Sequence, residues 1–330
     1  MRPRARCQPA LASGRHTGSC ARKREARMSK HRFVAIGECM VEMAPAEGGL
    51  FAMGYAGDTF NCAWYARRLL GPDWTVAYAT RAGRDSVSDG MVEFMAAEGI
   101  DTGHIARDPD RTLGLYLIQL TEGERSFAYW RGQSAARRLG EDSAWLDQVL
   151  DEARVAHVSG ITLAILDPAG RDTLCAALGR ARARGTHISF DTNLRPKLWE
   201  NADAMRAGLL IGASVADTVL PSFDEEETAW GDASPADTIA RYRDAGAGTV
   251  VVKNGAGPVT AWTDVDGLVE ITPAPVARVV DTTAAGDSFA AGFLAARLTG
   301  AEPGAAITRA ATLAGRVIGE RGALARGLFD

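Results

Sequence analysis

The segment Asp281-Thr282-Thr283-Ala284-Ala285-Gly286-Asp287-Ser288-Phe289 is a run of small residues that leads into an apolar stretch. Apolar side chains recur at near-helical spacing over residues 289–298, so we expect a helix to begin at this run. The first amides of a helix lack intrahelical partners and lie at the positive end of its dipole, which suits a phosphate. We therefore expect Ala284, Ala285 and Gly286 to form an anion hole, with Asp287 beside it to accept a proton.

A structural alternative exists for the same residues. Aspartate is a common N-cap of helices, and small residues are frequent where a loop packs tightly against a sheet. From spacing alone, both interpretations of Asp287 stay open.

The composition is that of an ordinary globular chain. It has 330 residues, of which 46% are hydrophobic and 24% charged, and a formal net charge of −4. This length suits one large α/β domain or two small ones. The charge does not favour nucleic acid as a partner, and no apolar run approaches the roughly 20 residues of a transmembrane helix. We expect binding to neither nucleic acid nor membrane.

Five cysteines are spread along the chain without C-x-x-C pairs: Cys7, Cys20, Cys39, Cys62 and Cys175. An odd number without framework spacing favours free thiols in a reducing compartment. We therefore expect a cytoplasmic protein.

Residues 1–30 differ from the rest, because nine Lys or Arg face a single acid, Glu25, without apolar periodicity. We expect this extension to be disordered. An organellar transit peptide is one interpretation, whereas the lack of an apolar core argues against a secretory signal. We favour a third interpretation, in which Met28 is the natural start and residues 31–330 form a single domain.

From residue 32 onward, strand-like and helix-like patterns alternate, which predicts βαβ units and a mostly parallel central sheet flanked by helices. The expected strands lie at residues 33–37, 75–79, 155–159, 187–191, 218–220 and 249–253, and the expected helices at 59–70, 85–98, 168–184, 202–213, 224–230 and 235–245. Hairpin patterns with Gly-containing turns predict a small β-sheet lid from about residues 38–55 and 111–132, including a turn at 121–124.

Polar residues follow four of the expected strands, at residues 159–160, 191–193, 221–222 and 253–255. The carboxyl ends of parallel strands line one crevice, so these ends should face one site together with Gly286 and Asp287. Two familiar nucleotide motifs are missing. The chain has no G-x-x-x-x-G-K-[ST] loop, and the first strand is followed by Gly37-Glu38-Cys39-Met40 instead of a G-x-G-x-x-G turn. A phosphate site must therefore use the turn at 284–287.

The 281–289 segment is similar to the C-terminal signature D-T-x-G-A-G-D-x-F of the PfkB (ribokinase-like) carbohydrate kinases. Its Ala-Ala-Gly form resembles that of the 2-keto-3-deoxygluconate kinases within this family. The resemblance extends over residues 32–323 and implies a ribokinase-like α/β fold. It also implies that the small-residue run is the anion hole and that Asp287 is the catalytic base.

Further motifs resemble the family in the same order along the chain. Ala56-Gly57-Asp58-Thr59-Phe60-Asn61 resembles the early G-G-D-x-x-N motif, with Ala56 in place of the first glycine. The resemblance implies sugar-acid contacts from this motif and from the lid: Gly57, Asp58, Asn61, Tyr116, Tyr129, Arg131, Arg195 and Asp287.

The nucleotide is expected in the C-terminal half. Ser222-Phe223-Asp224-Glu225 stands where most of the family has N-x-x-E, and Lys253-Asn254-Gly255-Ala256-Gly257 resembles a K-x-G-x-x-G loop whose last glycine comes one position early. The resemblance implies ATP contacts from Asn193, Ser222, Lys253, Asn254, Gly255, Gly257, Ala284, Gly286 and Ala311. It implies Mg²⁺ held through water near Glu225, and Arg195 at the junction of substrate and γ-phosphate.

The resemblance thus implies ATP-dependent phosphorylation of 2-keto-3-deoxy-D-gluconate to its 6-phosphate, by an enzyme that forms at least a homodimer through its lid. A kinase of a neutral sugar, like fructokinase or ribokinase, is one alternative, and a sugar- and nucleotide-binding regulator without catalysis is another. Structural interpretations also exist for single residues. Tyr116 and Tyr129 suit any sheet, Arg131 could be solvated, and Glu225 lies in an acidic first turn.

Overall fold

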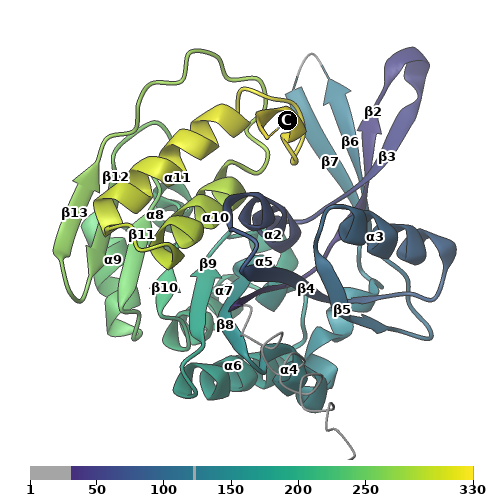
Figure 1. Ribbon diagram of the computed structural model, residues 1–330, viewed down its shortest axis with the longest axis horizontal. Coiled ribbons are helices and arrows are strands. Elements are labelled where there is room, and N and C mark those ends of the chain that lie inside the picture. Colours follow the sequence, from purple (N-terminus) through teal and green to yellow (C-terminus); the bar gives the residue numbers. More distant parts are fainter. Residues whose placement is uncertain (1–30, 122–123, 330) are drawn as a thin grey trace, which may run out of the picture. The chain divides into compact units, whose positions relative to one another are not determined.

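Nine strands form one sheet, in the order β13-β12-β11-β10-β9-β8-β1-β4-β5, within the computed structural model, which describes residues 31–121 and 124–329 (Figure 1). Neighbouring strands from β5 to β11 are parallel, and β12 and β13 add an antiparallel edge. The strands are β1 His31–Ile36, β4 Trp74–Ala82, β5 Asp101–Arg107, β8 Ala153–Ser159, β9 His187–Asp191, β10 Thr218–Val219, β11 Thr249–Val252, β12 Val259–Thr263 and β13 Gly267–Ile271.

The central strands are buried on both faces, as their alternating side chains show. In β1, Phe33 and Ala35 belong to one core cluster, whereas Val34 and Ile36 belong to the other. Successive residues of a strand point to opposite faces, so each face needs its own covering layer of helices.

Two sets of helices supply these layers. The cluster that contains Phe33 is covered by α2 Asp58–Leu69, α3 Ser86–Ala97, α10 Ala285–Leu298 and α11 Pro303–Val317. The cluster that contains Val34 is covered by α4 Ser143–Leu150, α5 Gly160–Ala164, α6 Pro168–Ala183, α7 Ala202–Ser214, α8 Phe223–Trp230 and α9 Pro235–Asp244. Short 3₁₀ turns are η1 Glu47–Gly49, η2 Ala135–Glu141, η3 Pro196–Leu198 and η4 Arg326–Leu328.

A second sheet of four strands in the order β3-β2-β6-β7 forms the lid in the described part of the chain (Figure 1). Its strands are β2 Met40–Pro45, β3 Phe51–Ala56, β6 Leu115–Thr121 and β7 Glu124–Trp130. Two antiparallel hairpins meet through the parallel pair β2 and β6. The predicted fold class, a mostly parallel sheet with helices and a small β lid, is confirmed.

Some expectations concern residues that the structure does not describe. These are the extension at residues 1–30, the two central turn residues 122–123, and the thiols of Cys7 and Cys20. Of the other three cysteines, Cys39, Cys62 and Cys175, each is buried and free. Among residues 31–121 and 124–329, no helix has both the length and the apolar character needed to cross a membrane.

Candidate active site

The turn before α10 has an unusual backbone. Ala284 is the N-cap of this helix and adopts a left-handed conformation, with φ 60° and ψ 16°. This conformation costs an alanine roughly 1–2 kcal/mol, and such strain is typical of functional sites. The amide of Ala285 donates to the carbonyl of Thr282 at 3.2 Å, so the expectation of three open amides needs correction. Gly286, whose amide has no acceptor among the described residues, is the open part of the turn.

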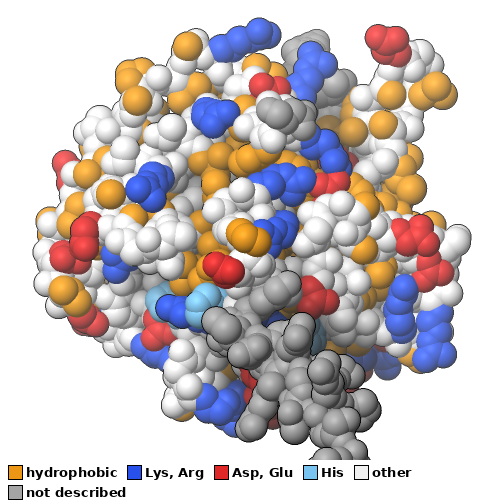
Figure 2. Space-filling model, viewed as in Figure 1, with side chains coloured by type: hydrophobic (Ala, Val, Ile, Leu, Met, Phe, Trp, Pro, Cys, Tyr) orange, Lys and Arg blue, Asp and Glu red, His pale blue; other side chains and the backbone are white. Residues whose placement is uncertain are grey.

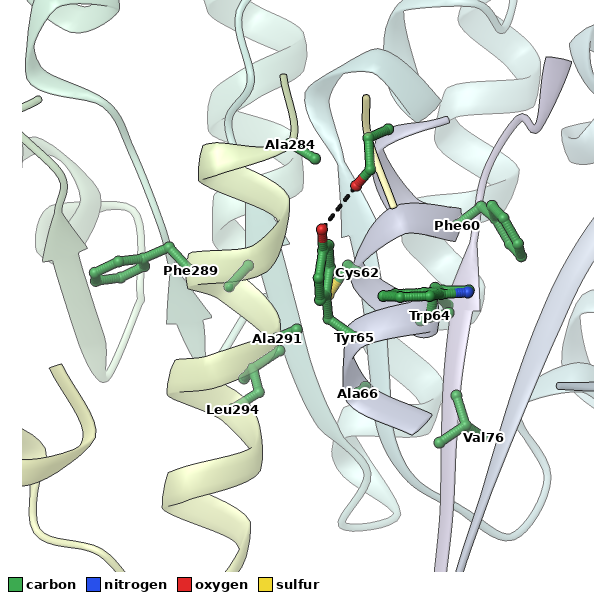
Figure 3. Close-up of a cluster of buried hydrophobic side chains, with 14 of the residues drawn as sticks. Phe60, Cys62, Trp64, Tyr65, Ala66, Val76, Ala284, Phe289, Ala291 and Leu294 are labelled. Atoms are coloured by element: carbon green, nitrogen blue, oxygen red, sulfur yellow. Dashed lines mark hydrogen bonds between the residues drawn. The ribbon is translucent and has the colours of Figure 1, made fainter. Parts of the chain in front are cut away.

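Asp287 lies in the first turn of α10 and faces α2. Its Oδ2 accepts a hydrogen bond from Asn61 Nδ2 at 2.7 Å, across 226 residues of sequence. Figure 3 shows why the two helices stay together: Cys62, Tyr65 and Ala66 of α2 face Ala291 and Leu294 of α10. Because Ala284 is the N-cap, the N-cap interpretation of Asp287 is wrong.

Burial and neighbouring acids make Asp287 an unusual aspartate. Burial, followed by the carboxylates of Asp58 and Asp191, raises the pKa of Asp287 to about 8. The hydrogen bond from Asn61 and the charge of Lys253 lower the pKa, but by less. A carboxylate with a raised pKa is a stronger base than a solvated aspartate.

Gly57 and Asp58 begin α2 directly beside this site. A Cβ on Gly57 would lie 2.1 Å from the carbonyl oxygen of Glu38, so only glycine fits this close crossing of two chain segments. Asp58 accepts from the amide of Thr59 at 2.8 Å and from Asn193 Nδ2 at 2.9 Å. The structure therefore brings Asn193, which we expected on the nucleotide side, into contact with the substrate motif.

A largely buried ion pair joins the ends of two strands of the sheet. Lys253 Nζ, after β11, lies 3.0 Å and 3.1 Å from the two carboxylate oxygens of Asp191, at the end of β9. A Cβ on Gly286 would be 3.4 Å from this Nζ. Two of the four expected strand ends, those of β9 and β11, thus converge with the α10 turn.

Glu225 and Arg195 pair with each other. Arg195 Nη1 donates to Glu225 Oε1 at 2.7 Å, and the amide of Leu194 donates to Glu225 Oε2 at 3.0 Å. Among the described residues, no cluster of three or more His, Cys, Asp or Glu could hold a metal by itself. Mg²⁺ usually keeps several waters and binds few carboxylates alongside substrate phosphates. The partly exposed Glu225 fits such a site through water, as a single outer carboxylate.

The expected nucleotide loop is a tight turn after β11. The amide of Gly257 donates to the carbonyl of Asn254 at 2.7 Å, and Gly255 has a φ of 53°, which favours glycine. Ser222 pairs with Lys253 in an isolated parallel bridge, so the two segments lie side by side. Ala311 is on α11, partly buried against the same core as α10.

Of the expected sugar-acid residues, the three from the lid region, Tyr116, Tyr129 and Arg131, lie close together. Tyr116 and Tyr129 are directly opposite in the β6 and β7 pairing, with ring centroids 6.0 Å apart. The guanidinium carbon of Arg131 is 6.0 Å from the centre of the Tyr129 ring. Tyr116 is buried and donates to Glu42 Oε2, whereas Tyr129 is half exposed.

Arg131 is buried in an ion pair with Glu38. The interpretation of Arg131 as a solvated strand arginine is therefore wrong. Its Nε and Nη2 both contact Glu38 Oε2, so the guanidinium has a counter-charge within the protein itself.

Three acids near the site were missed by sequence reasoning as functional residues: Glu38, Glu42 and Asp191. Each lies in or directly beside an apolar strand, where a carboxylate is costly to bury unless it has a partner. A carboxylate within or next to an apolar run was the signal that could have found them.

Comparisons with known proteins show which sequences and folds this chain is similar to. The sequence pattern of the pfkB family carbohydrate kinases matches residues 30–326. The 2-dehydro-3-deoxygluconokinase of Escherichia coli (strain K12) is 39% identical over 303 residues, covering 90% of this chain and 97% of that protein. A PfkB protein from Polaromonas sp. JS666 has a TM-score of 0.75 at 30% identity, covering 87% of this chain and 96% of that one. A fructokinase with bound ATP from Xylella fastidiosa has a TM-score of 0.76 at 25% identity, covering 90% and 94%.

Proposed function

Because the chain belongs to the pfkB family of carbohydrate kinases, we propose that it transfers the γ-phosphoryl group of ATP to 2-keto-3-deoxy-D-gluconate, forming the 6-phosphate. The observation that carries the substrate assignment is the 39% identity, over nearly the whole chain, to a relative named for this substrate. The lid adds support, because Arg131 lies beside Tyr129, which in turn lies beside Tyr116.

Asp287 accepts the proton of the 6-hydroxyl as that oxygen attacks phosphorus. Asn61 holds the carboxylate through the 2.7 Å hydrogen bond and so fixes its direction. In a loose transition state the hydroxyl need not ionise early, so positioning supplies most of the rate. Asp58, one turn before Asn61, binds a substrate hydroxyl together with Gly57.

The first turn of α10 receives the transferring group. The amide of Gly286 and the positive end of the helix dipole stabilise the negative charge of the phosphoryl oxygens. Glu225 would hold Mg²⁺ through water, and the ion would supply positive charge beside the phosphates. Asn193 orients the phosphates, and Arg195, already beside Glu225, neutralises charge where the substrate meets the γ-phosphate.

The rest of the nucleotide lies over the loop after β11 and against α11. Its contacts are Ser222, Lys253, Asn254, Gly255, Gly257 and Ala311. The lid closes over the sugar acid and excludes water, which would otherwise compete as a phosphoryl acceptor. ATP as the donor and three buried free thiols are consistent with a cytoplasmic enzyme.

Two alternatives are kept. A kinase for a neutral sugar is supported by the similarity to the fructokinase of Xylella fastidiosa. A non-catalytic regulator that binds sugar and nucleotide is disfavoured, because Asp287 keeps both its partner Asn61 and a raised pKa.

An ADP-release assay over a panel of sugars and sugar acids tests the proposal. We expect the highest kcat/KM for 2-keto-3-deoxy-D-gluconate and little turnover of fructose or ribose. A preference for a neutral sugar would overturn the substrate assignment and leave the kinase class intact. Absence of ADP release with every acceptor, together with measurable nucleotide binding, would favour the regulator.

A further inference from the structure

Lysine is rare in this chain, and one lysine occupies a largely buried position at the candidate site. The described residues include two lysines, Lys197 and Lys253, whereas arginine serves elsewhere as the basic residue. Lys197 is exposed, but the side chain of Lys253 is 11% exposed and that of its partner Asp191 is 5% exposed. A lysine is a compact point charge on a flexible stem, unlike the planar fork of arginine.

The sheet explains how this pair forms. Strands β9 and β11 flank β10, and all three are parallel, so Asp191 and Lys253 leave the sheet at the same edge. Both oxygens of Asp191 contact Nζ, at 3.0 Å and 3.1 Å, and these two contacts fix the position of the ammonium.

In this position, Nζ lies next to the first turn of α10. A Cβ on Gly286 would be 3.4 Å from Nζ, so a larger residue would press on the ammonium. A cation beside a helix N-terminus is electrostatically unfavourable, because the dipole is positive there as well. Two positive groups that converge on one open glycine suit a ligand anion between them, and Asp191 offsets the charge while that anion is absent.

We propose that Lys253 is a catalytic residue that contacts the phosphoryl group in transfer, and that Asp191 is a positioning residue that holds its ammonium beside Gly286. This inference rests on the proposed kinase function and gives Lys253 a role beyond binding the nucleotide. In the step, the acceptor oxygen forms a bond to the γ-phosphorus as the bond from phosphorus to the β,γ-bridging oxygen breaks. The bond electrons leave with ADP, and the hydroxyl proton passes to Asp287. Lys253 stays protonated throughout and stabilises the charge on the phosphoryl oxygens.

The same geometry predicts opposite pH effects for the two partners. Asp287 has two neighbours on α2, Asp58 and Asn61. The charges of Asp191 at the end of β9, of Lys253 after β11 and of Arg195 also act on it. Removing Lys253 takes away a cation, so ionisation of Asp287 becomes harder. Removing the charge of Asp191 takes away an anion, so ionisation becomes easier.

The experiment compares Lys253→Met, Lys253→Arg and Asp191→Asn with the control Lys197→Met, using the best acceptor of the wild-type enzyme. We expect Lys253→Met to lower kcat about 10²–10³-fold, the range for losing one transition-state donor, with a nearly unchanged KM for the sugar. The acidic limb of kcat/KM should move to higher pH in Lys253→Met and to lower pH in Asp191→Asn. Lys253→Arg should restore the limb but only part of kcat, and Lys197→Met should match the wild type.

Asp191→Asn could lose stability, since it leaves Lys253 buried without its partner. The double variant Asp191→Asn/Lys253→Met removes both charges and should fold, with the same kcat as Lys253→Met alone. An unchanged kcat in Lys253→Met with only a raised KM for ATP would overturn the inference. The inference would also be overturned if the acidic limb of kcat/KM moved in the same direction in Lys253→Met and Asp191→Asn. The proposed function fails separately, if the wild-type enzyme phosphorylates no acceptor.

Discussion

Arg131 Nε donates to Glu38 Oε2 at 2.8 Å, and Nη2 contacts the same oxygen, which joins the end of β7 to the segment between β1 and β2. The other oxygen of Glu38, Oε1, is buried and has no hydrogen-bond partner among the described residues. A Cβ on Gly114 would be 2.9 Å from this oxygen, so the segment just before β6 also packs against it. We propose that the contacts of Nε and Nη2 to Glu38 orient the guanidinium toward the carboxylate of the substrate.

We predict that Arg131→Ala loses both stability and affinity for the sugar acid. It leaves Glu38 buried without a counter-charge, which typically costs about 3–5 kcal/mol of unfolding free energy. The double variant Glu38→Leu/Arg131→Met removes both charges and should recover most of the thermal midpoint. Its KM for the sugar acid should stay raised by roughly 10–150-fold, as expected for a lost charged hydrogen bond of about 1.5–3 kcal/mol.

Thermal denaturation and sugar-acid kinetics check this prediction. Arg180→Ala is the matched control, because Arg180 forms an exposed ion pair with Asp147. Its loss should cost less than about 1 kcal/mol and leave KM unchanged. A double variant with the KM of the wild type would show that Arg131 does not bind the carboxylate.

The second prediction is that Asp287→Asn folds normally but loses phosphoryl transfer. The carboxamide keeps the shape of the side chain and removes the proton acceptor, which is typically worth roughly 10²–10⁴-fold in rate. Asp224→Asn, in an exposed part of α8, is the control and should keep full activity. Retention of more than about a tenth of wild-type kcat would contradict the role of Asp287.

The raised pKa of Asp287 also predicts how stability depends on pH. Below the pKa of an unfolded aspartate, about 4, the carboxyl is protonated in both states and has no effect. As the pH rises from there to about 8, the unfolded state loses this proton first, so the folded state becomes less stable. A carboxamide cannot ionise, so the Asp287→Asn variant should gain thermal midpoint over the wild type as the pH rises through this range. A constant difference over the same range would mean that Asp287 is not a buried base.

The sequence predicted the central βαβ pattern well, because its buried strands are short apolar runs with helices between them. It did not predict β5, since Asp101–Arg107 is a half-exposed edge strand with polar residues and no clean alternation. It also missed α4 and α5, which are only eight and five residues long. Short helices depend on tertiary packing and therefore give a weak local signal.

At the candidate site, the sequence indicated which residues belong to the site better than it indicated which residues they contact. The signature at 281–289 indicated Asp287 and its neighbours, but Asn61 lies 226 residues away in sequence and is joined to Asp287 only through the packing of α2 on α10. The pairs between Lys253 and Asp191, and between Arg131 and Glu38, depend in the same way on which strand ends meet. The strand pattern indicated that residues 191–193 and 253–255 share one edge of the sheet, but not which side chains pair there.

The third prediction concerns residues 1–27, which we propose to be dispensable. The match to the family begins at residue 30, and the candidate site residues all lie after residue 56 apart from Glu38 and Glu42. A chain that starts at Met28 should therefore keep its thermal midpoint and its kcat/KM. Differential scanning calorimetry and the ADP-release assay would check this, and a truncation that lowers either value would make the extension part of the enzyme.

The last prediction is that the enzyme forms at least a homodimer through the lid. The two edges of the four-stranded sheet, β3 and β7, have no neighbouring strand in the described residues, and exposed edges favour pairing with another chain. Apolar side chains also lie exposed along the lid, where Figure 2 shows orange atoms: Leu50, Phe51, Met53, Phe127, Tyr129 and Trp130. Such a patch on a sheet with open edges suits an isologous contact with a second copy, which would cover both.

Light scattering at micromolar concentration should give the mass of a dimer or a larger oligomer. The double variant Leu50→Asp/Met53→Lys places opposite charges in the apolar patch and should shift the enzyme toward the monomer, since each subunit must then bury them. Val265→Asp is the control, because Val265 is 90% exposed in the turn between β12 and β13, away from the lid strands. This variant should keep the mass of the wild type. A wild-type monomer, or an equal loss of mass in the control, would remove the lid as the interface.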